Sequence, residues 1–186
     1  MSPAISEFAY RHRGQLVAIP LVCAAICSWH EYENGPVTWA AAGIVFMIGL
    51  ALRVWSQQHL HFRLKANTNL TVTGPYALVR NPVYIANTLI YIALTLASEV
   101  LWLLPATILT CAIVYTLVVR YEEGKLAEQY GDAYLAYQRR VPRWVARWPN
   151  GLKPRWTSDY LRASLVAEAH NMLFIIPLLL KELLGR

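Results

Sequence analysis

Four contiguous apolar stretches constrain this 186-residue chain more than any other feature of its sequence. They cover residues 15–29, 37–54, 82–98 and 100–119. A helix needs about 20 residues to cross the hydrocarbon core of a bilayer, within a range of about 17–25. Only 15% of the residues are charged, whereas a typical soluble domain has about 25%. We therefore expect an all-α, polytopic integral membrane protein rather than a soluble domain.

A fifth apolar stretch, residues 161–180, is interrupted by polar side chains and by a proline. Glu168, His170 and Asn171 lie near its middle. Three alternatives remain open for this stretch: a fifth span, a re-entrant helix or an interfacial helix. The sequence predicts a single membrane domain over residues 1–186, with four or five transmembrane helices, and makes no prediction of the oligomeric state.

The positive charges lie at alternate ends of the predicted spans. Lys and Arg precede the first span, lie between the second and third, and are dense after the fourth, whereas the other two connections carry none. Positive charge collects on the cytoplasmic side of membrane proteins, so the N-terminus and the polar segments 55–81 and 120–160 are predicted to be cytoplasmic. The net charge of +6 follows from this topology and from contact with anionic membrane lipids. Nucleic acid is therefore not an expected partner.

Two polar blocks lie where apolar stretches meet water. The first polar block, residues 71–84, reads TVTGPYALVRNPVY and leads into the third apolar stretch. The second polar block, residues 120–142, reads RYEEGKLAEQYGDAYLAYQRRVP and follows the fourth. This placement suggests an enzyme that takes a soluble charged reagent from one side and a lipophilic substrate from the bilayer.

Helix continuations and breaks around these blocks follow from their residue types. Residues 55–66 are expected to continue the second helix beyond the bilayer. Residues 67–75 are expected to form a loop, in which the Gly74-Pro75 pair prevents regular helix. The fourth helix is expected to reach Tyr130, where Gly131 ends it and Asp132 caps a short helix.

Four charged residues at the ends of spans are candidates for chemistry. Arg53 and Arg120 lie at matching ends of the second and fourth spans. They are either snorkelling anchors or parts of a shared anion site at membrane depth. Glu122 and Glu123 point about 100° apart in a helix, so either one faces inward while the other faces water, or both belong to a solvated charged turn, which the residue types alone favour. An inward carboxylate can hold the ammonium group of a ligand.

Histidine and tyrosine side chains leave further alternatives open. His59 and His61 lie on different faces of a helix, and no further ligands are obvious near them, so no metal site is predicted. The tyrosines of the polar blocks, such as Tyr76 and Tyr84, are either membrane-boundary anchors or the walls of a pocket for a flat ring.

Together, the two polar blocks resemble the isoprenylcysteine carboxyl methyltransferase and phospholipid methyltransferase family of integral membrane enzymes. The first block is similar to the family pattern G-x-Y-x-x-x-R-H-P-x-Y at Gly74, Tyr76, Arg80, Asn81, Pro82 and Tyr84. The second block is similar to the pattern E-E-x-x-L, then Phe/Tyr-Gly, then Y-x-x-Y-x-x-x-V-P, at Glu122, Glu123, Leu126, Tyr130, Gly131, Tyr134, Tyr137, Val141 and Pro142. Two linked patterns in the right order are specific, whereas either alone is weak.

The resemblance implies an S-adenosyl-L-methionine-dependent methyltransferase with a lipophilic acceptor. It implies cofactor contacts at His61, Thr68, Asn69, Leu70, Thr71, Tyr76, Asn81, Pro82, Val83, Tyr84 and Glu122. It also implies catalytic, acceptor-side roles for Arg53 and Arg120. Asn81 stands where the family has His, and an amide can form hydrogen bonds but cannot titrate. A role that needs a protonated imidazole is therefore not expected at this position.

Two other functions stay open at the level of the sequence. One is N-methylation of a phospholipid or another lipid amine, because nothing in the chain identifies the acceptor. The other is a non-enzymatic membrane scaffold or transporter subunit that keeps the motifs for structural reasons. A sulfonium donor is already activated, so proximity and orientation, worth about 7–11 kcal/mol, are the main demands on an enzyme of the first kind.

Overall fold

The computed structural model describes residues 3–26, 35–66, 70–147, 160–169 and 176, with the backbone alone at 3, 61–66, 167 and 169. This part of the chain is all-helical, without strands. Its elements are α1 (Pro3–Ile26), α2 (Gly35–Ala66), the 3₁₀ turn η1 (Gly74–Ala77), α3 (Pro82–Ala97), the 3₁₀ turn η2 (Leu101–Leu103), α4 (Leu104–Tyr130), α5 (Asp132–Arg140) and α6 (Leu161–Ala169).

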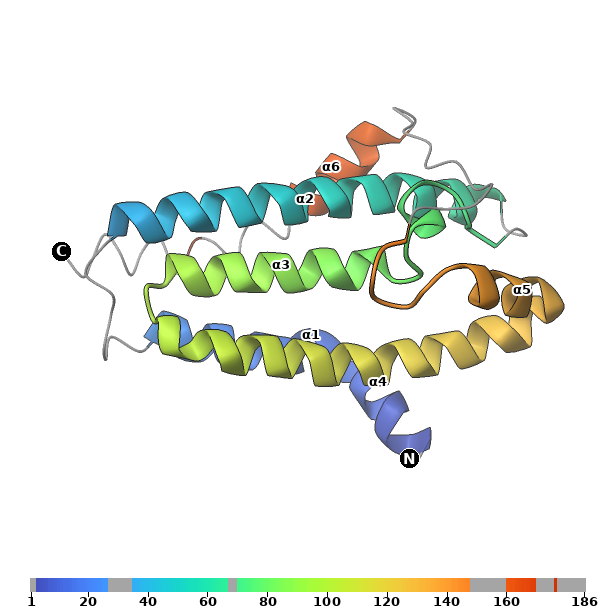
Figure 1. The fold of residues 1–186 in the computed structure, drawn as a ribbon, viewed down its shortest axis with the longest axis horizontal. Coiled ribbons are helices and arrows are strands. Elements are labelled where there is room, and N and C mark those ends of the chain that lie inside the picture. The colour runs from blue at the N-terminus through green and yellow to red at the C-terminus, as the bar shows by residue number, and fades with distance from the viewer. Residues whose placement is uncertain (1–2, 27–34, 67–69, 148–159, 170–175, 177–186) are drawn as a thin grey trace.

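The long helices run side by side, with α3 between α2 and α4 (Figure 1). Helix α1 packs against α4, and α6 packs against α2. Helices α2 and α4 both extend beyond the first residue of α3 at the same end of the molecule, where η1 and α5 also lie (Figure 1). The two polar blocks therefore meet at this end.

Two helical stretches, Gly35–Leu60 and Leu101–Tyr130, are long and apolar enough to cross a membrane, and α3 is a shorter apolar helix. Large apolar side chains are exposed along α2 and α4, among them Ile44, Met47, Ile48, Ile108, Leu109 and Ile113. Polar side chains are buried between helices instead, as in the Thr95–Thr107 hydroxyl contact of 3.0 Å. Extensive exposed apolar surface suits contact with lipid.

Several expected helix ends are confirmed. The third span, 82–98, corresponds to α3 with Pro82 in its first turn, where the missing N–H costs nothing. Helix α2 continues past residue 54 to Ala66, and α4 continues to Tyr130 with Gly131 as its C-cap.

Other boundaries differ from expectation. Helix α1 begins at Pro3, ahead of the predicted span 15–29, and residues 27–29 of that span lie outside the described residues. Helix α4 begins at Leu104 rather than at residue 100, because η2 precedes it. The expected cap by Asp132 is wrong: Gly131, at φ 51°, is the N-cap of α5, and Asp132 is the first residue inside that helix. Of the fifth apolar stretch, residues 170–175 and 177–180 lie outside the described residues.

Gly74 allows the chain to turn sharply at the start of η1. Its φ is +60°, a left-handed conformation that L side chains rarely adopt. A Cβ atom at this position would also clash with the ring of His59. That ring is buried, and its Nδ1 lies 2.9 Å from the Thr73 hydroxyl. The turn and the end of α2 therefore fit each other only when residue 74 has no side chain.

We expect Gly74→Ala to lower the melting temperature of the purified protein in detergent by several degrees. The left-handed conformation costs a non-glycine residue about 1–2 kcal/mol, and the clash with His59 adds to this cost. Gly124→Ala is the matched control, because a Cβ there meets no atom within 4 Å and alanine favours a helix interior. Equal melting of Gly74→Ala and wild type would contradict the requirement for glycine.

Candidate functional site

A cavity of about 350 Å³ lies where the two polar blocks meet. Its lining comes from α1, α2, η1, the loop between η1 and α3, the start of α3 and the end of α4. The lining residues are Tyr10, Leu60, Tyr76, Arg80, Asn81, Val83, Tyr84, Glu122, Lys125, Leu126 and Gln129. Cavities that bind small molecules usually measure about 300–1,000 Å³ and combine apolar walls with a few polar groups. Both the size and the lining are those of a small-molecule site.

One hydrogen bond spans the cavity wall between α3 and α4. The Tyr84 hydroxyl donates to Oε1 of Glu122 at 2.7 Å. The Tyr84 ring also packs on the Tyr115 ring, with 4.8 Å between the centroids. These contacts fix the direction of the Glu122 carboxylate at the cavity.

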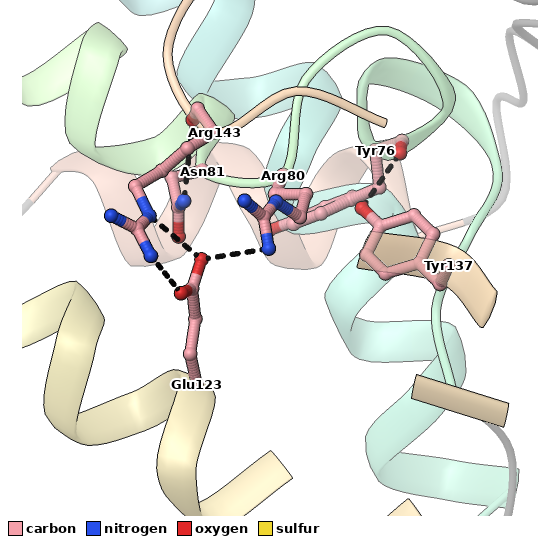
Figure 2. Close-up of polar contacts among 6 residues, drawn as sticks. All are labelled: Tyr76, Arg80, Asn81, Glu123, Tyr137 and Arg143. Atoms are coloured by element: carbon pink, nitrogen blue, oxygen red, sulfur yellow. Dashed lines mark hydrogen bonds and ion pairs between the residues drawn. The ribbon is translucent and has the colours of Figure 1, made fainter. Parts of the chain in front are cut away.

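The neighbouring carboxylate, Glu123, binds two guanidinium groups (Figure 2). Its Oε1 lies 3.2 Å from Nη1 of Arg80 and accepts a 3.1 Å hydrogen bond from Nε of Arg143, while its Oε2 pairs with Nη2 of Arg143 at 2.5 Å. Glu123 is only 7% exposed, and its hydrogen bond raises the pKa of Arg143. Glu122 is half-buried at the cavity, so Glu123 is the glutamate of this pair that faces inward.

The segment after α5 closes over the first polar block through backbone groups. The N–H of Arg80 donates to the Pro142 carbonyl at 2.9 Å, and the N–H of Arg147 donates to the Leu78 carbonyl at 3.0 Å. These two bonds hold the segment against the loop between η1 and α3, so the cavity wall has a fixed geometry.

Two side chains add to this closure (Figure 2). The Asn81 amide donates to the Arg143 carbonyl at 3.3 Å, and the Tyr137 hydroxyl donates to the Tyr76 carbonyl at 2.8 Å. Burial raises the pKa of the Tyr137 phenol, so the phenol stays protonated and can donate. The amide in place of the family histidine thus joins the first polar block to the segment after α5 with its N–H group.

The structure brings five of the expected cofactor contacts into the cavity wall: Tyr76, Asn81, Val83, Tyr84 and Glu122. Pro82 is buried at the start of α3. Leu70 packs against the buried cluster of Tyr134, Tyr137 and Val141, and Thr71 follows it in the half-buried loop. Thr68, Asn69 and the side chain of His61 lie outside the described residues.

Arg53 and Arg120 occupy different surroundings. Arg53 on α2 pairs with Glu168 of α6 at 2.5 Å and hydrogen-bonds Asn87 of α3. Glu168 is only 2% exposed, so this ion pair is a buried link between three helices. Arg120 is exposed on α4. Helix α3 lies between their two helices (Figure 1), and neither arginine is among the described residues that line the cavity.

Several lining residues were not expected from the sequence. Tyr10 reaches the cavity because α1 packs on α4, and no local pattern around Tyr10 signals this contact. Lys125 and Gln129 follow Glu122 at spacings of three and seven residues. These spacings place the three side chains on one face of a helix, so the sequence could have indicated that they share the cavity. Within the described part of the chain, no group of three or more His, Cys, Asp or Glu side chains could hold a metal ion.

The fold and the cavity define an all-helical membrane protein with a polar, ligand-sized site at one end of its helices. The chain belongs to the phospholipid methyltransferase family, whose pattern matches residues 37–133, which confirms the resemblance seen in the two polar blocks. This family comprises membrane methyltransferases, and the match covers both glutamates and the first polar block.

Two curated proteins are similar over most of the chain. The cobalt-zinc-cadmium resistance protein CzcN of Cupriavidus metallidurans is 30% identical over 155 residues, which cover 79% of this chain and 69% of the relative. The nickel-cobalt-cadmium resistance protein NccN of Alcaligenes xylosoxydans xylosoxydans is 28% identical over 151 residues, or 77% and 68% of the two chains. No solved structure matches the chain.

We expect Glu123→Gln to destabilise the protein by about 1–3 kcal/mol, because it leaves two arginines without their shared carboxylate. The loss should be below that of a fully buried pair, about 3–5 kcal/mol, since the Arg143 side chain is 33% exposed. Thermal melting in detergent measures the change. Glu128→Gln, an exposed position on the same helix, is the control, and equal effects of the two substitutions would refute the role of Glu123.

Proposed function

We propose that the chain is an integral membrane methyltransferase that uses S-adenosyl-L-methionine and methylates a lipophilic acceptor. The observation that carries the proposal is the cavity formed by both polar blocks, with an oriented carboxylate at Glu122. Family membership supports methyl transfer as the reaction. The bound cofactor would supply a methyl group activated on a sulfonium.

The lining of the cavity fits this cofactor. Glu122 accepts hydrogen bonds and would hold an ammonium group, as charge-assisted hydrogen bonds are among the strongest in proteins. The rings of Tyr10, Tyr76 and Tyr84 offer walls for a flat base. The tyrosine hydroxyl on Glu122 keeps this carboxylate in place before the ligand arrives, which reduces the cost of ordering on binding.

A second cavity offers a place for the lipophilic acceptor. It measures about 360 Å³, lies between α3 and α4, and is lined by Ile85, Thr88, Leu89, Ile108, Cys111, Ala112, Tyr115, Thr116 and Trp144. Tyr115 of this apolar cavity contacts Tyr84 of the polar cavity. We propose that the acceptor chain lies here, so that its reacting head reaches the donor beside this ring pair.

The membrane arrangement is part of the proposal. We propose four or five spans, with the N-terminus and the polar cavity on the cytoplasmic side. The reason is that the N-terminal segment and the polar segments 55–81 and 120–160 carry most of the Lys and Arg residues, which collect on the cytoplasmic side of membrane proteins. Arg53 and Arg120 are proposed as acceptor-side residues. The ion pair with Glu168 neutralises much of the charge of Arg53, so this arginine acts best by orienting Asn87 of α3 through their hydrogen bond.

We expect saturable binding of S-adenosyl-L-methionine to the purified protein in isothermal titration. Glu122→Ala should weaken this binding about tenfold or more, through loss of a charge-assisted hydrogen bond, while the melting temperature changes little. Glu128→Ala is the control on the exposed face of α4. Absence of binding to the wild type would instead favour a non-enzymatic scaffold or transporter subunit.

The acceptor can be found by mass spectrometry of lipid extracts incubated with isotope-labelled donor and the protein. The names of the two relatives recommend extracts from cells grown with and without cobalt or cadmium. A labelled carboxylate ester, thioether or lipid amine would each identify one class of acceptor, the last of them as expected for a phospholipid N-methyltransferase.

Once the acceptor has been identified, Arg53→Lys and Arg120→Lys test whether these two arginines act on the acceptor side. Lysine keeps the charge but loses the planar guanidinium, so we expect methyl transfer to fall about tenfold or more with unchanged donor affinity. Arg140→Lys, at an exposed position on α5, is the control. Full activity in a variant would show that its arginine is only a membrane anchor.

A further inference from the structure

Lys125 is a charged residue of the polar cavity that neither the family patterns nor the proposed mechanism uses. It lines the cavity three residues after Glu122 on α4. Side chains at this spacing lie on the same helix face, with Cβ atoms about 5–6 Å apart. The side chains of Glu122 and Lys125 therefore border the same cavity, one ending in a carboxylate and the other in an ammonium group.

Aromatic rings hold the Lys125 ammonium in place. Its Nζ lies 4.5 Å from the ring centroid of Tyr121 and 5.5 Å from that of Tyr10, and the two rings are themselves 4.9 Å apart. Cations are attracted to ring faces at such distances. The contact restricts a side chain that is otherwise long and mobile, and it joins α1 to α4.

The other charged groups nearby already have partners. Arg13 of α1 donates to the Tyr10 carbonyl at 2.6 Å and lies over the Tyr10 ring, and two further groups are engaged in ion pairs. Glu7 of α1 pairs with Arg11 at 2.6 Å, and Arg80 of the cavity pairs with Glu123 at 3.2 Å. Lys125, by contrast, forms no ion pair with any residue that the structure describes. It is therefore the cavity cation best placed to receive an anionic group of a ligand.

We propose that Glu122 and Lys125 together recognise the zwitterionic amino-acid end of the methyl donor. Glu122 accepts hydrogen bonds from the donor's ammonium group, and Lys125 donates to its carboxylate. Tyr10 and Tyr121 are positioning residues that hold Lys125 over their rings. This inference rests on the proposed function and adds to it the residue that binds the donor carboxylate, together with a contribution from α1, which lies outside the segment matched by the family.

Two ligands that differ only at this end test the inference. S-adenosylhomocysteine carries the amino-acid group, and 5′-methylthioadenosine shares its adenosine and thioether but lacks that group. We expect the wild type to bind S-adenosylhomocysteine more tightly. Lys125→Met, which keeps the apolar stem, should weaken that ligand about tenfold or more and leave the affinity for 5′-methylthioadenosine unchanged.

Matched variants separate this role from a general structural one. Tyr10→Phe keeps the ring and should keep the preference between the two ligands, whereas Tyr10→Leu should reduce it. Lys125→Arg should retain most of the preference, because a guanidinium also binds carboxylates. Arg139→Met removes an exposed cation from α5 and should have no effect on either ligand.

The outcomes are distinguishable in one set of titrations. If the wild type binds neither ligand, the proposed function itself fails. If it binds both ligands equally, or if Lys125→Met binds S-adenosylhomocysteine as tightly as the wild type does, the cofactor site stands and the role of Lys125 is refuted. A loss in Lys125→Met that affects both ligands equally refutes it too, because recognition of the amino-acid end requires a selective loss.

Discussion

The geometry of the site depends on the buried carboxylate of Glu123 and the two arginines that bind it. Arg80 comes from the loop before α3 and Arg143 from the segment after α5. A buried carboxylate that loses its partners pays a large desolvation cost. Arrangements that separate the two polar blocks are therefore strongly disfavoured, and the ion pairs select one register between the end of α4 and the loop before α3.

The adjacent carboxylates of Glu122 and Glu123 have different roles, because successive side chains of a helix point about 100° apart. Glu123 points into the closure between the blocks, while Glu122, one position earlier, points to the cavity and meets the Tyr84 hydroxyl. The hydrogen bonds of Asn81 and Tyr137 to backbone carbonyls keep the closure in place. Polar groups that are fully satisfied in this way give a rigid wall, and a rigid wall favours recognition of one ligand geometry.

Much of the fold could be predicted from the sequence, because local residue types decide where helices end. Pro82 starts α3 and Gly131 ends α4 as expected, and the meeting of the two polar blocks followed from the family patterns. The contacts of Tyr10, the partners of Glu123 and the pairing of Arg53 with Glu168 were not predictable. Each depends on how distant helices pack and turn about their axes, and small rotations that no local pattern fixes decide which side chains meet.

The order of synthesis gives the closure through Arg143 a further consequence. When the ribosome has passed residue 130, helices α1 to α4 and all the residues that line the cavity have been made, but the segment that binds Arg80 and Glu123 has not. A nascent chain that stops there holds all four long helices without a closed site. The cavity lining therefore gains its fixed geometry only when the segment after α5 has been added, so insertion of the four long helices and closure of the site are separate events.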